Sequence, residues 1–251
     1  MGSQSGSEIV PFKSFLSCSF PPLLFLTYLL YPPRPSLSHQ IFPLLTSFSK
    51  TMETTSPRQK AEGLLHALEK YGEGDYIGES ISQLEHCLQA AHQASKADAR
   101  DELVIAALLH DVGQIIPLQS TRDARMTLGV STENVGRVGH ETIGALYLRS
   151  LGFSETVSRL VNSHVSAKRY LTATDIGYYN SLSTASQKSL AFQGGPFQGD
   201  ALREFETDPL RKEMVLLRLW DDAAKVEGVE ATTPRVQAYL DMIIRHLELQ
   251  V

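Results

Sequence analysis

The 251-residue chain contains only two cysteines, Cys18 and Cys87. Two thiols cannot form a disulfide framework or a thiolate zinc site, and they are compatible with a reducing compartment, so we expect a cytoplasmic protein. The formal net charge of −5 argues against a nucleic-acid-binding surface, because such a surface needs clustered Lys and Arg. The oligomeric state does not follow from the sequence.

The first 52 residues lack acidic side chains between Glu8 and Glu53, and Ser, Pro, Leu and Phe dominate there. Prolines interrupt the apolar part, and its uninterrupted stretch, 23–31, is far shorter than the roughly 20 residues that span a bilayer. We therefore expect no stable membrane span. Three interpretations remain open for residues 1–52: an organelle-targeting segment, a weak membrane anchor, or residues upstream of a true start at Met52, which we favour. We expect residues 53–251 to form the folded domain.

No convincing strand pattern or internal repeat follows residue 57. Apolar residues instead recur at three- and four-residue spacing, which is typical of amphipathic helices. The stretch 102–113 is apolar almost all round, so we expect it to be the central helix of a bundle. The sequence predicts an all-α fold with a polar loop at 117–137 and helices near 57–71, 80–97, 102–113, 140–152, 154–171, 181–194, 208–226 and 236–250.

Several histidines and aspartates lie in these predicted helices. Each alone is more often an ordinary core or surface residue, and we expect Asp222 to be solvated. Burying several imidazoles and carboxylates together is costly, however, unless they are paired or coordinate a cation. Inward-facing side chains of a helical bundle can hold two metal ions if one carboxylate bridges them, and their types suit iron, manganese or zinc. The candidate ligands are His86, His110, Asp111, His140, His164 and Asp221.

The order His, His-Asp, His, His, Asp resembles the HD-domain superfamily. More specifically, the chain resembles its mixed-valent di-iron oxygenases, which cleave carbon–phosphorus bonds and include the glycine-forming 2-amino-1-hydroxyethylphosphonate dioxygenases. The resemblance covers about two-thirds of the chain and rests on YGEGDYIGESISQLEHCLQAA (71–91), LLHDVG (108–113), GHETIGALYLRSLGFSETVSRLVNSHVSAKRYL (139–171), SLSTASQKSLAFQGGP (181–196) and LRLWDDAAKVEG (217–228).

The resemblance implies two iron ions, Fe(II) and Fe(III), with dioxygen as co-substrate. One iron would be held by His86, His110, Asp111 and Asp221. The second would be held by His140, His164 and the bridging Asp111. By the same resemblance, Tyr76 occupies the second iron until substrate displaces it, and Glu79 receives the amino group of the substrate.

The resemblance also assigns phosphonate binding to Lys168, Ser186 and Arg218. Helical spacing is compatible with this, because Lys168 follows His164 by four residues and Arg218 precedes Asp221 by three. Gln114 stands where related sequences often have His or Lys. It can donate a hydrogen bond to phosphonate but carries no charge, so we expect weaker binding or a changed choice of substrate.

The expected reaction is oxidative cleavage of a small phosphonate, 1-hydroxy-2-aminoethylphosphonate, to glycine and phosphate. Glu79 favours a primary amine, since a trimethylammonium group has no N–H and prefers aromatic faces. The trimethylated analogue, giving glycine betaine, stays open because Tyr170, Tyr178 and Tyr179 could contribute to an aromatic cage. A metal-dependent phosphohydrolase, a myo-inositol-oxygenase-like enzyme and a non-catalytic HD fold also stay open at this point.

Overall fold

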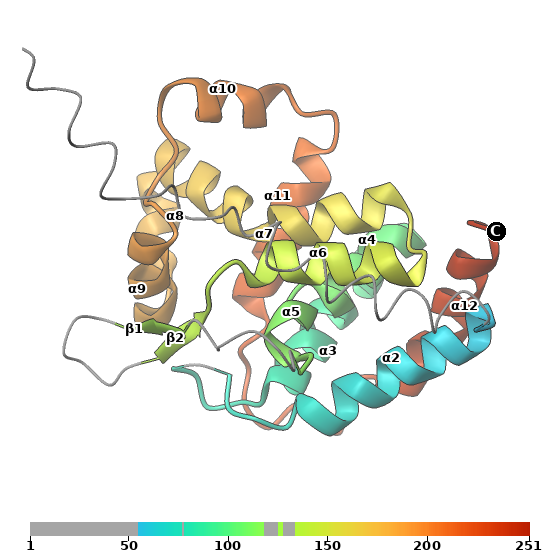
Figure 1. Cartoon of the computed structure of the whole chain (residues 1–251). Helices are drawn as coiled ribbons and strands as arrows, with labels where there is room; N and C mark the ends of the chain where they lie inside the picture. The colour runs from blue at the N-terminus through green and yellow to red at the C-terminus, as the bar shows by residue number, and fades with distance from the viewer. Residues whose placement is uncertain (1–54, 77, 118–124, 128–133) are drawn as a thin grey trace, which may run out of the picture. The chain divides into compact units, whose positions relative to one another are not determined.

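The computed structural model describes residues 55–76, 78–117, 125–127 and 134–251 (Figure 1). The prediction of an all-α bundle is confirmed. Residues 1–52 lie outside the described residues, so their separation from the folded domain stays a prediction. Within the described part of the chain, the helices are α2 (Pro57–Tyr71), α3 (Gln83–Lys96), α4 (Asp101–Leu109), α5 (Val112–Ile115), α6 (His140–Leu151), α7 (Glu155–Thr174), α8 (Ile176–Ser181), α9 (Thr184–Phe192), α10 (Gly199–Thr207), α11 (Arg211–Ala223), the 3₁₀ turn η1 (Val236–Tyr239) and α12 (Leu240–Glu248).

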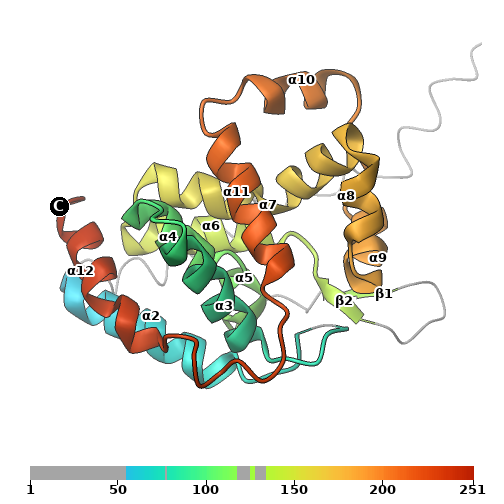
Figure 2. The same ribbon diagram turned by 180° about the vertical axis from the view of Figure 1, so that it is seen from behind.

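Helix α4 lies at the centre of the bundle, as its composition predicted. Every side chain from Leu103 to Leu109 is buried, so α4 has no polar face to present to water beyond its first two residues, Asp101 and Glu102. Helices α3, α7 and α11 pack around it. Figure 2 shows α3 and α4 side by side with α11 next to them. None of the helices among the described residues has the length and apolar character needed to cross a membrane.

Helix starts follow the local sequence. Ser56, Ser82 and Ser154 each accept a hydrogen bond from a backbone N–H in the first turn of α2, α3 and α7. Ser56 forms a full capping box with Gln59, and Pro57 occupies the first helical position, where its missing N–H costs nothing. The predicted starts of α2 and α7 agree with the observed ones within one residue, and α3 starts three residues later than predicted, directly after its cap Ser82.

The predicted loop at 117–137 contains two short strands, so the expectation that strands are absent was wrong there. Strand β1 (Arg125–Thr127) pairs antiparallel with β2 (Asn134–Arg137). Strands of three and four residues are too short to show alternation in sequence. Helices α8 and α10 were also not predicted as separate helices, and they occupy the segments between the predicted helices at 154–171, 181–194 and 208–226.

The helix predicted at 102–113 is interrupted at the His-Asp pair. Helix α4 ends at Leu109, and α5 starts at Val112. Gly113 then lies directly against the start of α6, where a Cβ would overlap the carbonyl oxygen of His140 and lie 2.8 Å from the nitrogen of Gly144. The glycine after the His-Asp pair is therefore required for the close approach of α5 and α6, which brings His140 near Asp111.

We predict that Gly113→Ala lowers the free energy of unfolding by about 1–3 kcal/mol, because backbone must move to make room for the methyl group. The matched control is Gly63→Ala in the exposed middle of α2, where nothing except its chain neighbours and the nearby backbone of α2 itself lies within 4 Å of the new Cβ. This control should raise the free energy of unfolding by about 0.5–1 kcal/mol through helix propensity. Denaturant unfolding of both variants measures the difference. A Gly113→Ala variant as stable as wild type would disprove the close packing.

Candidate metal centre

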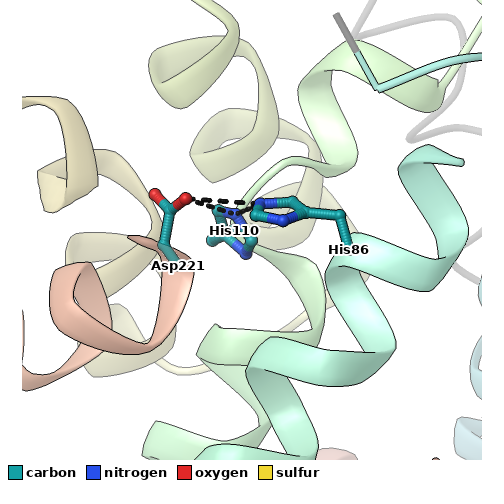
Figure 3. Close-up of side chains that lie close together, drawn as sticks. All are labelled: His86, His110 and Asp221. Atoms are coloured by element: carbon teal, nitrogen blue, oxygen red, sulfur yellow. Dashed lines mark hydrogen bonds and ion pairs between the residues drawn. The ribbon is translucent and has the colours of Figure 1, made fainter. Parts of the chain in front are cut away.

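Two groups of three buried side chains converge inside the bundle. His86 from α3, His110 at the end of α4 and Asp221 from α11 point toward one another in Figure 3. The second group is formed by Asp111, by His140 at the start of α6 and by His164 in the middle of α7. In each group the potential ligand atoms lie within 4.8 Å of one another. The six predicted ligands are thus brought together by the fold.

Asp111 lies between the two groups. Its Oδ2 is 3.7 Å from His110 Nε2 and 3.9 Å from His86 Nε2. Its Oδ1 is 3.2 Å from His140 Nε2 and 3.6 Å from His164 Nε2. Each carboxylate oxygen therefore faces a different histidine pair, which is the arrangement that a bridging ligand requires.

All four histidines direct Nε2 to the centre because Nδ1 is held elsewhere. The Nδ1 atoms of His86, His110 and His164 each lie 2.8 Å from a backbone carbonyl, of Ala224, Ala107 and Val161 respectively. His140 Nδ1 lies 3.0 Å from the carbonyl of Arg137. A carbonyl only accepts, so Nδ1 carries the proton and the neutral ring presents the Nε2 lone pair to the centre. Backbone hydrogen bonds of this kind orient metal-ligating histidines.

The packing of these lone pairs fits metal ions. His86 Nε2 and His110 Nε2 are 3.0 Å apart, and His140 Nε2 and His164 Nε2 are 2.9 Å apart. Two lone pairs at such distances repel each other unless a cation or a proton is shared between them. Asp221 Oδ1 is also buried without a hydrogen-bond partner among the described residues, which is costly for a carboxylate. The donor set therefore suits cations bound at both groups.

The ionisation states of His164, His110 and Asp111 agree with this arrangement. For His140, burial alone would lower the pKa, but the facing Asp111 carboxylate raises it, so a cation would have to displace a proton there. Burial, reinforced by the charge of His140, lowers the pKa of His164 to about 3, so its ring is neutral at neutral pH. Burial also lowers the pKa of His110. Burial alone would raise the pKa of Asp111, but the facing histidines, His110 foremost, hold it well below its usual range. Neutral imidazoles and an ionised carboxylate are the forms that bind metal.

A cavity of about 60 Å³ opens beside Asp111, His140 and His164, which is room for a few waters or one small polar substrate. The predicted catalytic and substrate-binding residues come from five separate parts of the chain, yet all of them line this cavity. They are Tyr76, Glu79, Gln114, Lys168, Ser186 and Arg218.

Comparison with known proteins agrees with this geometry. The HD domain family matches residues 84–221, a range that begins just before His86 and ends at Asp221. The chain belongs to the HD-domain family.

Sequence relatives of this HD-domain protein show more specifically which proteins it is similar to. It is 38% identical over 193 residues to a hydroxymethylphosphonate dioxygenase of Gimesia maris, a match covering 77% of this chain and 88% of the relative. It is 35% identical over 180 residues to a glycine-betaine-forming 1-hydroxy-2-(trimethylamino)ethylphosphonate dioxygenase of Leisingera caerulea, covering 72% and 86%. An uncharacterized protein, L432, of Acanthamoeba polyphaga mimivirus is 32% identical over 189 residues, covering 75% and 82%. The predicted resemblance to HD-domain phosphonate oxygenases is confirmed.

Arg218 connects the metal centre of this HD domain to the cavity. Its NH1 donates to Asp221 Oδ2 at 2.6 Å, and its Nε lies 3.0 Å from Asp222 Oδ2, while NH2 contacts Asp222 Oδ1. Tyr178 OH donates to Asp222 at 2.6 Å and accepts from Arg218 Nε at 3.2 Å. Asp222 is therefore an ion-pair partner of Arg218, and the expectation that it is solvated was wrong. An i, i+4 spacing is compatible with either role, so the sequence did not distinguish them.

Lys168 also has a partner that the sequence did not reveal. Its ammonium group donates to Ser189 Oγ at 2.8 Å, and Ser189 lines the same cavity. Burial, with the charge of Arg218 adding to it, lowers the pKa of Lys168 to about 7. An anion in the cavity would favour the charged form of Lys168.

Gln114 has a structural role beside its place in the cavity wall. Its Oε1 accepts a hydrogen bond of 2.7 Å from the backbone N–H of Arg137. The Arg137 side chain in turn donates to the carbonyls of Gly113 and Ile116. These bonds join strand β2 to α5 and fix the backbone from which His140 starts. Binding of phosphonate by Gln114 stays a prediction.

Aromatic side chains are scarce in the cavity wall. Tyr76 lines the cavity, and its ring stacks on His86 with centroids 3.8 Å apart. Burial, helped by the charge of Asp221, raises its pKa well above the usual value and keeps the phenol protonated. Tyr170 stacks instead on Phe205 at 4.7 Å, and neither Tyr178 nor Tyr179 lines the cavity. The described residues therefore provide no cage of several aromatic rings.

We predict that Asp111→Asn abolishes tight binding of metal at both groups, because the amide removes the negative charge that faces all four histidines. Asp221→Asn should weaken the group formed with His86 and His110 and leave the other group able to bind. Elemental analysis of the purified variants gives the metal content per chain. The control Asp241→Asn, on the exposed side of α12, should match wild type. Full metal content in Asp111→Asn would contradict the bridging role.

Proposed function

We propose that this protein is a di-iron, oxygen-dependent phosphonate dioxygenase that cleaves the carbon–phosphorus bond of a small 1-hydroxyphosphonate. The observation that carries the proposal is the Asp111 carboxylate between two histidine pairs, beside a cavity that contains Lys168 and Arg218. Two relatives are named dioxygenases, and both substrates in their names carry a hydroxyl group on the carbon bonded to phosphorus.

His86, His110, Asp221 and one oxygen of Asp111 would hold one iron ion. His140, His164 and the other oxygen of Asp111 would hold the second. Histidine and carboxylate ligands also suit manganese and zinc, so the choice of iron rests on the dioxygenase relatives. When bound, the two irons would supply dioxygen activation and the redox chemistry that protein side chains lack.

The chain's own residues would bind and orient the phosphonate. A guanidinium group has five N–H donors. Arg218 uses one on Asp221 and two on Asp222 and Tyr178. Two N–H groups are left that could donate to phosphonate oxygens. Lys168 adds a second positive charge and Ser186 a hydroxyl group in the same cavity.

The cavity wall favours some substituents on the hydroxylated carbon over others. A trimethylammonium group binds best against several aromatic faces, and Tyr76 is the one tyrosine among the described residues that line the cavity. We therefore propose that the substrate carries no quaternary ammonium. A primary amine, which Glu79 could bind, and a substrate with no amine at all both remain compatible with this wall.

We predict that the iron-loaded enzyme releases one phosphate for each dioxygen consumed when given hydroxymethylphosphonate or 2-amino-1-hydroxyethylphosphonate. Phosphate release and oxygen uptake are measured together, with and without oxygen. A nucleoside monophosphate without oxygen serves as the control for phosphohydrolase activity and should release nothing. Phosphate release from the nucleotide, with none from either phosphonate under oxygen, would replace the proposal with a phosphohydrolase.

Metal content tests the two-iron part of the proposal separately. Wild-type protein from iron-rich medium should contain two irons per chain. His140→Ala should retain one iron and its fold, since the group of His86, His110 and Asp221 keeps all its own ligands. His92→Ala, which changes a histidine outside both groups, should still contain two. A wild-type protein that binds at most one metal ion tightly would rule out the di-iron site.

A further inference from the structure

Lys225 has a position in the cavity that the sequence did not predict. Its ammonium nitrogen lies 3.1 Å from Glu79 Oε1, the carboxylate expected to bind a substrate amine. The same nitrogen donates to Ser183 Oγ at 3.2 Å and to Ser186 Oγ at 3.0 Å. The side chains of Lys225 and Glu79 are only 13% and 18% exposed, and both line the cavity. Lys225 thus lies between the predicted amine-binding residue and a predicted phosphonate-binding residue.

The backbone around Lys225 is fixed on both sides. The carbonyl of Ala224 accepts from His86 Nδ1 at 2.8 Å. Val226 exchanges two hydrogen bonds with the buried Gln89 side chain, at 3.0 Å from its N–H and 2.8 Å to its carbonyl. His86 and Gln89 are three residues apart in α3 and so lie on one face of that helix. The ion pair of Lys225 with Glu79 is therefore built on the same segment that orients a candidate metal ligand.

We propose that Lys225 is a specificity-determining residue, whose ion pair with Glu79 selects a 1-hydroxyphosphonate without an ammonium group, such as hydroxymethylphosphonate. Lys225 already compensates the negative charge of Glu79, so an ammonium group gains less from this carboxylate than it would from an unpaired one. A substrate with no amine leaves the pair intact. Lys225 also lies close enough to Ser186 to contact a phosphonate bound there. This inference rests on the proposed function, and it reverses the preference for a primary amine that follows from Glu79 considered alone.

The test compares kcat/KM on hydroxymethylphosphonate and on 2-amino-1-hydroxyethylphosphonate. Wild type should prefer hydroxymethylphosphonate. Lys225→Met leaves Glu79 without a partner, so the ratio of the two kcat/KM values should shift toward the amine by about ten-fold or more, the effect of one charged hydrogen bond. Lys225→Arg, which keeps the charge, should retain the wild-type preference. Lys212→Met, at the exposed start of α11, is the matched control and should change neither value.

Glu79→Gln provides the opposite perturbation. It leaves the charge of Lys225 unpaired, which repels an ammonium group, so the ratio should shift further toward hydroxymethylphosphonate. The double variant, Lys225→Met with Glu79→Gln, should give a ratio of the two kcat/KM values between those of the single variants. Binding of both phosphonates without oxygen, measured by calorimetry, should show the same shifts in Kd, because the selection acts on binding.

Equal losses on both substrates in Lys225→Met would show a structural role only and would overturn the inference. A wild-type preference for the amine would also overturn it. If Lys225→Met does not fold, the Glu79→Gln and Lys225→Arg variants still decide the direction of the shift. Failure of the wild type to act on either phosphonate under oxygen would instead refute the proposed function itself.

Discussion

The Asp111 carboxylate, buried among four imidazoles, is the constraint on which the rest of the structure depends. Its two oxygens face different histidine pairs, and a buried carboxylate in such a place needs positive charge on both sides. The interruption between α4 and α5 turns Asp111 toward α6 and α7. Gly113 then lets the backbones of α5 and α6 touch, which brings His140 within 3.2 Å of the carboxylate. The position of the candidate ligand His140 therefore depends on the close backbone contact between α5 and α6.

Helix α11 and the segment after it couple the metal centre to the substrate cavity. Asp221 belongs to the first histidine pair and accepts from Arg218, which lines the cavity. A few residues later, Ala224 orients His86, and Lys225 pairs with Glu79. A shift of this one segment would move two candidate metal ligands, His86 and Asp221, together with Arg218 and Lys225 in the cavity wall. Gln89 holds the segment in place.

The HD-domain fold by itself does not define the reaction, since one fold can carry different chemistries. The side chains of the site and the dioxygenase relatives together support a phosphonate dioxygenase. Two metal-binding groups share one carboxylate, and the adjoining cavity has lysine and arginine charges suited to an anion. The positive charge is not spread evenly over the cavity wall, because Lys225 is paired there with the carboxylate of Glu79. Under the proposal made for Lys225, the site would distinguish substrates by the charge on their substituent as well as by the phosphonate.

The sequence by itself determined the helical class, the central place of α4 and the identity and order of the six candidate ligands. Helical periodicity and capping depend on residues only three or four positions apart, so they can be recognised in the sequence without knowledge of the tertiary structure. The tertiary structure alone decided which oxygen of Asp111 faces which histidine pair, that Asp222 pairs with Arg218, and that Lys225 neutralises Glu79. These features depend on contacts between distant segments, such as His86 and Ala224, which are 138 residues apart in the chain. Periodicity and spacing within single helices carry no information about such contacts.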